Sequence, residues 1–448
     1  MAAPTNTYVN YATGTGHGND YKGATFTNGA YTSATKTLVK ASAFAANLAG
    51  HWLYLESNDG GSIVAGFYKI ATWTDANTVV LATDAGAGVD DDAAKCVQHD
   101  GTTSLPWRSI QGALDLITRD ATNGDQINVK AGTAVVNQAA LALTTYGTPA
   151  EGAPLIIRGY TTAANDRGMG EIDCNGLVMW AVTTHVCLGL IDLEIHNGGN
   201  NNLITNSGIG SFMYHCEVHK GASSPSAKGL INSFTRVVGC YVHDAGTSGY
   251  GISATETAYG NFVEDCPNGI NVAGVSQVVF NNIVVDSTVI GIRVAADNGV
   301  VIGNSIYSST ANTGKGISVE AGHTHAVILN NIVQGYSGVA GVGLSAAADV
   351  AVMGYNAFYN NTANESLGDV MFNLENDAEI VGATSPFTNA AGGDFSLNTA
   401  VAGAIDGAFP GAWYGPASTT DHADIGAVQN PAGAGTSVRH PRGLWIMR

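Results

Sequence analysis

The middle of the chain repeats at a period of a little over twenty residues. Each repeat carries a short segment whose third residue is apolar, as in Cys216-Glu-Val-His and Asn261-Phe-Val-Glu. Such segments begin at Leu193, Cys216, Cys240, Asn261, Asn282, Asn304, Asn331 and Asn356, and subtracting successive positions gives steps of 23, 24, 21, 21, 22, 27 and 25. A unit of this length cannot bury its own apolar side chains, so it must stack on its neighbours. The repeat therefore predicts a solenoid.

Two further apolar segments accompany the repeats. One follows, with starts at Gly229, Gly251, Gly269, Gly291, Gly316 and Gly341, and another precedes, with starts at Arg236, Gln277, Gly299, Ala326 and Val350. The 58 glycines are in keeping with the many tight turns that such coils need. We therefore expect an all-β fold, a right-handed parallel β-helix with three strands per coil and about ten coils.

Stacking places equivalent residues in columns along the axis, about 4.8 Å apart. One column contains Cys216, Cys240, Asn261, Asn282, Asn304, Asn331 and Asn356. Its asparagine amides are expected to bond to one another. Two positions later an apolar column is expected to point inward as well, formed by Ile195, Val218, Val242, Val263, Val284, Ile306, Val333 and Phe358. The six cysteines include no CxxC pair, so we interpret them as mostly buried thiols rather than zinc ligands.

A capping helix is predicted over residues 106–119. Ile110, Ala113, Leu114 and Ile117 follow helical spacing, and Ser109 is the expected N-cap. The segment from Trp107 to Gly132 resembles the helix and first coil of pectate-lyase-like right-handed parallel β-helix proteins. The resemblance extends over residues 103–430 and implies fold rather than chemistry, because that fold hosts lyases, hydrolases, adhesins and phage tailspikes.

The flanking regions complete the expected domain organisation. Residues 1–20 form a lead-in with the first strand, and 21–98 form a small inserted β domain that resembles modules of phage and metagenomic virion proteins. The β-helix with its capping helix occupies 99–390, a closing segment 391–430, and a linker with a tail 431–448. The tail is basic and aromatic on an otherwise acidic chain, through Arg439, Arg442, Trp445 and Arg448. We interpret it as a docking peptide for a larger assembly, with a frayed end as the alternative.

Charge and composition limit the classes of partner. The formal net charge of −18 repels phosphate backbones, so nucleic-acid binding is not expected. No apolar run is long enough to span a membrane. The N-terminal Met-Ala-Ala-Pro-Thr-Asn-Thr lacks the basic and apolar regions of a signal peptide, so none is expected in this chain.

Two outward columns are the candidates for chemistry. His196, His219 and His243 form one column and Glu264 continues it, while Asp244, Asp265 and Asp286 form the next. Carboxylates on neighbouring rungs, about 5 Å apart, match the needs of a glycosidase. We therefore predict catalysis by Glu264, Asp265, Asp244 and Asp286 and glycan binding by the three histidines, with a solvated structural row as the alternative. No cofactor is expected. The clustered oxygens leave Ca²⁺ as an alternative, and the identity of any metal stays open.

Three functions remain open at this point. The first is a bacteriophage virion surface protein, a tail spike, tail fibre or capsid decoration, that contacts host-surface polysaccharide and other virion proteins. The family resemblance implies a homo-oligomer, with a trimer favoured, in the virion or outside the cell. The second is a polysaccharide lyase or glycoside hydrolase acting through the acidic columns. The third is a non-catalytic bacterial surface adhesin. The sequence does not decide whether the chain is an enzyme.

Overall fold

The computed structural model describes strand β1 (Thr5–Val9), strands and turns between residues 25 and 99, and most of residues 109–398. Between 25 and 99 it describes residues 25–26, 30–42, 49, 52–55, 66–86, 89–90 and 94–99. Between 109 and 398 the gaps are 118, 133, 138, 144–145, 181–185, 200–202, 220–228, 248, 348–349, 369, 375–377 and 380–383. The chain divides into two compact units, residues 1–148 with 155–171, and 149–154 with 172–448. Each unit is described by itself.

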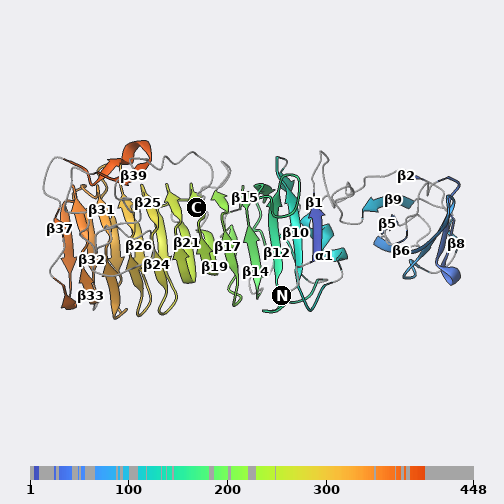
Figure 1. The fold of residues 1–448 in the computed structure, drawn as a ribbon, viewed down its shortest axis with the longest axis horizontal. Coiled ribbons are helices and arrows are strands. Elements are labelled where there is room, and N and C mark those ends of the chain that lie inside the picture. Colours follow the sequence, from blue (N-terminus) through green and yellow to red (C-terminus); the bar gives the residue numbers. More distant parts are fainter. Residues whose placement is uncertain are drawn as a thin grey trace. The chain divides into compact units, whose positions relative to one another are not determined.

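The first unit contains an antiparallel sheet (Figure 1). Its strand order is β2-β9-β5-β6-β7-β4-β3-β8. One face is sealed by apolar side chains that include Tyr31, Leu38, Leu53 and Ile70. This sheet lies where the sequence predicts the inserted β domain, whose boundaries at 21 and 98 stay a prediction. The elements are β2 (Thr25–Phe26), β3 (Ala30–Thr32), the 3-10 helix η2 (Ser33–Thr35), β4 (Thr37–Val39), β5 (Trp52–Leu55), β6 (Gly66–Asp75), β7 (Thr78–Leu81), β8 (Val89–Asp90) and β9 (Ala94–His99).

Helix α1 (Ile110–Leu116) also belongs to the first unit. The Ser109 side chain accepts a hydrogen bond from the backbone N–H of Gly112 at 2.9 Å, as an N-cap does. The helix is shorter than the expected 106–119, because Ile117 already has an extended backbone; residues 106–108 and 118 lie outside the described residues. The helix contacts β1 and β10 (Asp125–Lys130), which pair in parallel, and β10 pairs with β12 (Leu155–Tyr160). Its role as a cap stays a prediction.

The second unit is a parallel β-helix of about eight turns in the described part of the chain. Each coil contributes one short strand to a sheet that we call the first-strand sheet (Figure 1). The all-β parallel β-helix predicted from the sequence is thus confirmed. The first-strand sheet is formed by β15 (Leu193–His196), β18 (Glu217–His219), β20 (Tyr241–His243), β22 (Phe262–Glu264), β25 (Ile283–Val285), β28 (Ser305–Tyr307), β31 (Ile332–Gln334), β34 (Ala357–Tyr359) and β37 (Ala378–Glu379).

The second and third strands of each coil form the other wall. Strands β19 and β21 are each ten residues long, and each supplies both the second and the third strand of its coil. Bulges interrupt their pairing near Phe234. Strands β11 (Val135–Val136) and β13 (Gly170–Asp173) precede this region. The wall contains β14 (Leu188–Ile191), β16 (Ile204–Thr205), β17 (Phe212–Tyr214), β19 (Gly229–Val238), β21 (Tyr250–Tyr259), β23 (Asn268–Val272), β24 (Val278–Phe280), β26 (Ile290–Val294), β27 (Val300–Ile302), β29 (Lys315–Val319), β30 (Ala326–Leu329), β32 (Val342–Ala346), β33 (Val350–Gly354), β35 (Ala363–Leu367) and β36 (Val370–Asn373).

The predicted asparagine ladder lies inside the coils. The Nδ2 group of Asn261 donates to Oδ1 of Asn282 at 2.9 Å, and Asn282 donates in the same way to Asn304 at 3.0 Å. The series continues through Asn331 to Asn356. The apolar column two positions later is buried along its whole length. Side chains that alternate about each strand therefore seal the interior as the repeat predicts.

Glycines mark close approaches between rungs of the second strand. A Cβ added at Gly269 would lie 2.5 Å from the carbonyl oxygen of Gly291, and one added at Gly291 would lie 2.6 Å from that of Gly316. The glycines at the two ends of this series do not pair with one another. Gly229 pairs with Tyr250 rather than Gly251, and the register of β29 and β32 places Gly316 beside Gly343 rather than Gly341, because turn lengths differ between coils.

A short hairpin lies against the outside of the first-strand sheet. It consists of β38 (Phe387–Asn389), the 3-10 helix η3 (Ala390–Gly392) and β39 (Asp394–Leu397). Phe387 and Phe395 pack on outward side chains of the coils, which are Phe262, Ile283, Val285, Tyr307, Ile332 and Ala357. The first part of the predicted closing segment therefore covers a side of the solenoid. Residues 399–430 and the predicted docking tail lie outside the described residues.

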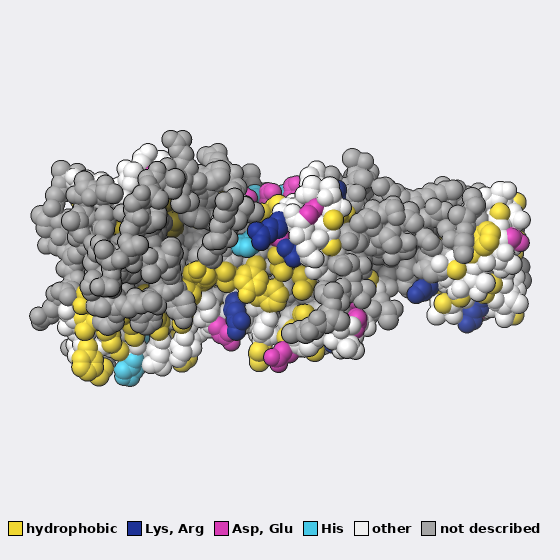
Figure 2. All heavy atoms as spheres, in the orientation of Figure 1, with side chains coloured by type: hydrophobic (Ala, Val, Ile, Leu, Met, Phe, Trp, Pro, Cys, Tyr) yellow, Lys and Arg dark blue, Asp and Glu magenta, His cyan; other side chains and the backbone are white. Residues whose placement is uncertain are grey.

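Most apolar side chains are interior, but a few reach the surface. Ile209, Val275 and Val339 are exposed in turns, and Met371 and Phe372 are exposed on β36. Figure 2 shows one face on which apolar side chains are visible beside few basic ones. Among the described residues, no helix has the length and apolar character needed to cross a bilayer.

Candidate functional site

The candidate site lies on the outer face of β18, β20 and β22. Val218, Val242 and Val263 point into the core, so the residues on either side of them point outward. The outward pairs on these strands are Glu217 with His219, Tyr241 with His243, and Phe262 with Glu264. The face therefore changes along the stack from acidic and imidazole side chains to aromatic and apolar ones.

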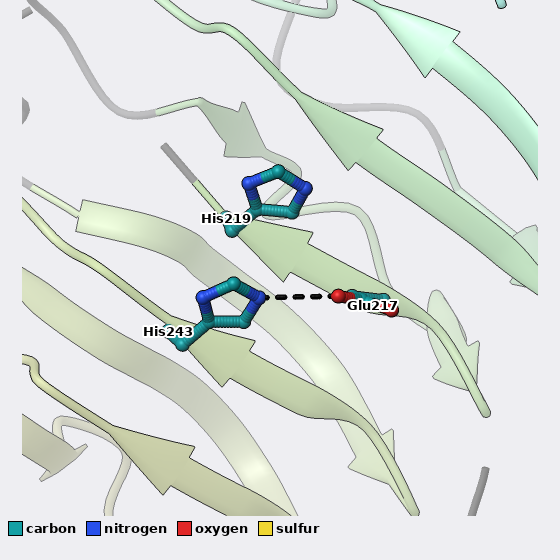
Figure 3. Close-up of side chains that lie close together, drawn as sticks. All are labelled: Glu217, His219 and His243. Carbon is teal, nitrogen blue, oxygen red and sulfur yellow. Dashed lines mark hydrogen bonds and ion pairs between the residues drawn. The ribbon is translucent and has the colours of Figure 1, made fainter. Parts of the chain in front are cut away.

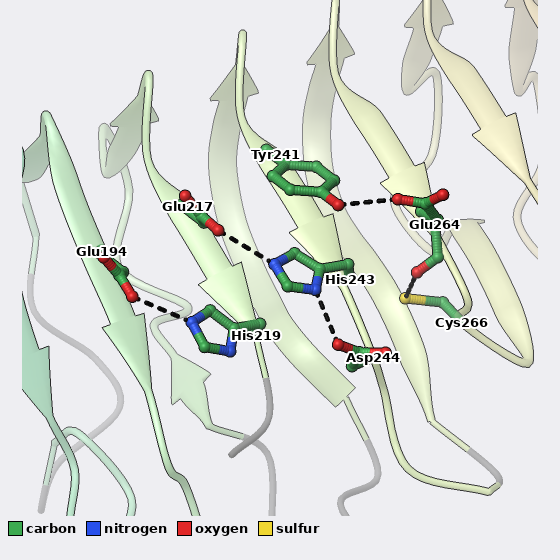
Figure 4. Close-up of polar contacts among 8 residues, drawn as sticks. All are labelled: Glu194, Glu217, His219, Tyr241, His243, Asp244, Glu264 and Cys266. Carbon is green, nitrogen blue, oxygen red and sulfur yellow. Dashed lines mark hydrogen bonds and ion pairs between the residues drawn. The ribbon is translucent and has the colours of Figure 1, made fainter. Parts of the chain in front are cut away.

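The three predicted histidines form one stack. The ring centroids of His196 and His219 are 5.3 Å apart, and those of His219 and His243 are 4.7 Å apart with nearly parallel planes. Each of the last two rings bonds a glutamate from the preceding rung, His219 to Glu194 and His243 to Glu217, both at 3.2 Å (Figure 4). The stack is thus held by carboxylates along one edge.

Two pKa shifts follow from these contacts. The hydrogen bond with His219 lowers the pKa of Glu194. Burial by itself would lower the pKa of His243, but the bonds to Glu217 and to Asp244, at 2.9 Å from Nδ1, outweigh it and raise that pKa. Both nitrogens of the His243 ring are therefore held by carboxylates.

Tyr241 joins the histidine stack to the acidic residues above it. Its ring stacks on His243 at 4.3 Å, and its hydroxyl donates to Oε2 of Glu264 at 2.7 Å (Figure 4). Burial and the Glu264 carboxylate raise the pKa of the Tyr241 phenol, so it remains a donor at neutral pH. The bond also fixes the Glu264 side chain at the centre of the face.

The acidic column has a local structural reason. Asp244, Asp265 and Asp286 have positive φ angles of 57°, 49° and 53° just after their strands. Aspartate and asparagine tolerate this left-handed conformation better than most residues. Asp286 is used within the coil, because its carboxylate accepts from the backbone N–H of Ser309 at 2.6 Å and from its hydroxyl at 3.0 Å.

Asp265 differs from Asp286 in its surroundings. Its side chain is largely exposed to solvent. Even so, some loss of hydration and the nearby carboxylates of Glu264, Asp286 and Asp244 raise its pKa. The structure thus brings three of the four residues predicted to be catalytic, Asp244, Glu264 and Asp265, to one place and gives Asp286 a structural contact. Their catalytic role stays a prediction.

A pocket of about 690 Å³ lies over this face. One side of it is formed by the strands and their turns, and the other by the hairpin. Gly393, with a φ of 79°, turns the hairpin at the pocket, where small residues leave the space open. The lining residues are Glu217, Tyr241, His243, Asp244, Phe262, Glu264, Asp265, Ala391, Gly392 and Gly393.

Sequence reasoning missed part of this site. Glu194, Glu217 and Tyr241 stand two residues before the histidines, a spacing that places both side chains on the same face of a strand. That signal was present in the sequence. The hairpin was predicted only in part: the closing segment expected from residue 391 includes its second strand, but residues 385–398 carry none of the repeat and gave no sign that they line a pocket.

Comparisons with known proteins give fold-level similarities. No protein-family model and no curated protein matches the chain. A pectate lyase structure is 13% identical, covers 74% of this chain and 93% of its own, and has a TM-score of 0.46. A mutant tailspike protein of an Escherichia coli bacteriophage is 12% identical, covers 60% of this chain and 62% of its own, and has a TM-score of 0.36. Neither similarity bears on the chemistry of this chain, whose parallel β-helix is shown by its own strand pairings.

Proposed function

We propose that this protein is a surface-displayed β-helix protein that binds a glycan in the pocket between β18, β20, β22 and the hairpin. The observation that carries the proposal is a pocket of about 690 Å³ in which aromatic and carboxylate side chains converge. Its volume falls in the range of small-ligand sites, about 300–1,000 Å³. Aromatic rings offer apolar faces to sugar rings, and carboxylates accept hydrogen bonds from sugar hydroxyls.

The charge of the pocket narrows the glycan class. Glu217, Asp244, Glu264 and Asp265 line it, and His243 is the sole basic group among the described lining residues. An anionic sugar in the pocket would be repelled by these carboxylates, because charges in contact lie within the roughly 8 Å screening length of physiological salt. The preferred ligand is therefore a neutral polysaccharide or one that contains free amino sugars.

The test of the proposal is direct binding to purified bacterial surface polysaccharides. Titration calorimetry with neutral, amino-sugar and uronate-containing oligosaccharides should show binding to one of the first two. Glu217→Gln should weaken it roughly 10-fold or more, because a hydrogen bond to a charged group contributes about 1.5–3 kcal/mol. Glu256→Gln is the matched control, since Glu256 is exposed on β21 beside Arg236 and away from the pocket. Equal affinities for both variants and the parent protein would reject the site.

The virion role predicted from the sequence is a more specific version of this proposal. In that role the β-helix contacts host polysaccharide, while other parts of the chain join the protein to the particle and to further copies. The antiparallel sheet ahead of the β-helix supports this form, because it is a separate structure that could serve attachment. Light scattering on the purified full chain should give a trimer, and a stable monomer would argue for an adhesin instead.

Hydrolysis of the bound glycan is the second candidate function. Asp265 is the residue that favours it, because a carboxyl with a raised pKa can serve as a proton donor. Asp244 occupies the equivalent position one rung away, about 4.8 Å in a β-ladder, close to the roughly 5 Å separation of retaining glycosidases. Release of reducing ends from the bound polysaccharide should be abolished in Asp265→Asn and Glu264→Gln. Binding without release would leave the protein a lectin-like surface protein.

A further inference from the structure

Three side chains on adjacent rungs form a candidate metal site. Glu217, His219 and His243 each present a ligand atom, and these atoms lie within 4.8 Å of one another (Figure 3). Their side chains are 30%, 20% and 16% exposed, so each is partly shielded and still reachable from solvent. The stacking of the coils, rather than a local loop, brings the three together.

A second observation concerns how His243 is oriented. Its Nδ1 atom bonds the Asp244 carboxylate at 2.9 Å, which leaves Nε2 directed at Glu217, 3.2 Å away. Histidines that bind metals commonly bond a carboxylate through the nitrogen that does not ligate, and this fixes both ring orientation and tautomer. Glu194, from the preceding rung, bonds the His219 ring through Nε2 rather than Nδ1, at 3.2 Å. Carboxylates therefore orient both imidazoles of the cluster.

We propose that Glu217, His219 and His243 bind a divalent cation of the zinc class. Two imidazole nitrogens and one carboxylate oxygen suit borderline metals such as Zn²⁺, Co²⁺ and Ni²⁺, whereas Ca²⁺ and Mg²⁺ take oxygen ligands. This assignment differs from the Ca²⁺ alternative that the acidic column suggests. Two imidazoles with one carboxylate also make up the three protein ligands of many open zinc sites, whose fourth position belongs to water.

Binding requires a small contraction of the cluster. Zinc bonds of about 2.0–2.1 Å place tetrahedral ligand atoms roughly 3.4 Å apart. The Glu217–His243 pair at 3.2 Å already meets this spacing, so the His219 ring is the group that must move. Because Glu217 and His243 line the pocket, the open coordination position would face it. The ion would then present a water molecule or a ligand hydroxyl to the pocket.

The experiment measures metal binding by the full chain without any glycan. After treatment with EDTA and its removal, titration calorimetry with ZnCl₂ should show a high-affinity site that His243→Gln and Glu217→Gln each weaken at least 10-fold. His323→Gln is the matched control, because His323 lies 3.8 Å from Asp297 in a turn outside the cluster. It should bind zinc as the parent does, and CaCl₂ should give no comparable heat.

A spectroscopic readout separates this cluster from the other histidines. Co²⁺ added to the parent chain should give the visible absorption of a four-coordinate site, and His219→Asn should abolish it while circular dichroism stays unchanged. Zinc or cobalt signals that persist in the Glu217, His219 and His243 variants would overturn the proposal. Glycan binding measured in EDTA keeps the two ideas distinct, because it tests the proposed function without the metal.

Discussion

At the scale of single residues, the turn after the first strand shows how one backbone position serves two purposes. Asp265 and Asp286 share a left-handed conformation, with φ angles of 49° and 53°. Asp286 accepts two hydrogen bonds from Ser309, whereas Asp265 faces the carboxylates of Glu264 and Asp244. Aspartate at this position therefore makes stabilising hydrogen bonds in one coil and is repelled by neighbouring carboxylates in the adjacent coil.

We predict that Asp265→Asn stabilises the protein at neutral pH. A carboxyl whose pKa is raised by folding contributes stability below its unfolded pKa, about 3.9, and loses it as the pH rises through the folded pKa. Asparagine fits the left-handed turn and removes the repulsion, so the free energy of unfolding should rise by up to about 1 kcal/mol, a small gain because the side chain is exposed. Urea unfolding at pH 7 and pH 3 checks this, with the gain confined to pH 7.

Asp286→Asn is the control for that prediction. It alters the same turn position but weakens an acceptor that receives the N–H and hydroxyl of Ser309. It should lower the free energy of unfolding at neutral pH. A gain from Asp265→Asn that persisted at pH 3, where the carboxyls are protonated, would mean that carboxylate repulsion is not its cause.

The buried asparagine ladder supports a second prediction. Asn304 donates to the carbonyl oxygens of Val279 and Ile302 and accepts from the backbone N–H of Asn282 at 3.0 Å. Asn304→Ala removes the acceptor of the buried Asn282 N–H and the amide donor to Val279, although the Ile302 carbonyl keeps its bond from the backbone N–H of Asn281. An unsatisfied buried group costs about 1–3 kcal/mol, so a loss of roughly 3 kcal/mol is expected. Chemical denaturation measures it. Asn298→Gly is the control, because Asn298 is exposed with a φ of 57° that glycine adopts freely, and it should change stability little.

At the scale of elements, the sequence predicted the inward columns well because they obey a strict period. The outer face was harder to predict. Ile283-Val-Val forms a strand in which all three side chains are buried, and such continuous apolar runs indicate burial on both faces. The closing segment predicted from residue 391 contains Phe395, but nothing indicated that it covers Ile283 and Val285, since the hairpin lies outside the repeat. The fusion of the second and third strands into the long strands β19 and β21 was also not predicted, because the bulge at Phe234 leaves no repeating pattern in the sequence.

The hairpin supports a third prediction, about local opening. Phe395 is buried and packs edge to face against Phe262 and Phe387, at ring distances of 5.9 Å and 5.4 Å. Phe395→Ala should cost about 3 kcal/mol of local packing and so raise hairpin opening roughly 100-fold. Hydrogen exchange should accelerate at the paired residues Phe387 and Leu397 and not in β25.

The matched control for the hairpin is Phe372→Ala. Phe372 lies on β36 and is 63% exposed, so its truncation removes little packing. In the Phe372→Ala variant, the backbone amides of the hairpin should exchange as fast as in the parent chain. Glycan affinity should fall in Phe395→Ala alone if the hairpin is a true wall of the pocket. Unchanged exchange in Phe395→Ala would mean that the aromatic contacts do not hold the hairpin in place.

At the scale of the whole molecule, the second unit is a one-dimensional stack. Each coil pairs with the coil before and the coil after it, as β22 does with β20 and β25. Stability in such proteins is approximately a sum of coil and interface contributions. Removing one complete coil should therefore preserve every kind of contact and reduce only their number.

The last prediction follows from this additivity. Asn261 and Asn282 stand 21 residues apart at the same register, so deleting residues 262–282 joins Asn261 directly to Ile283. β25 should then pair with β20, and the ladder should run from Asn261 to Asn304. Circular dichroism should show an intact β-structure with one cooperative unfolding transition, while deletion of residues 262–271 should disrupt both. The full-coil deletion should fold, but it also removes Glu264 and Asp265 and should therefore fail to bind the glycan. If the two deletions unfolded alike, the coils would not be independent stacking units.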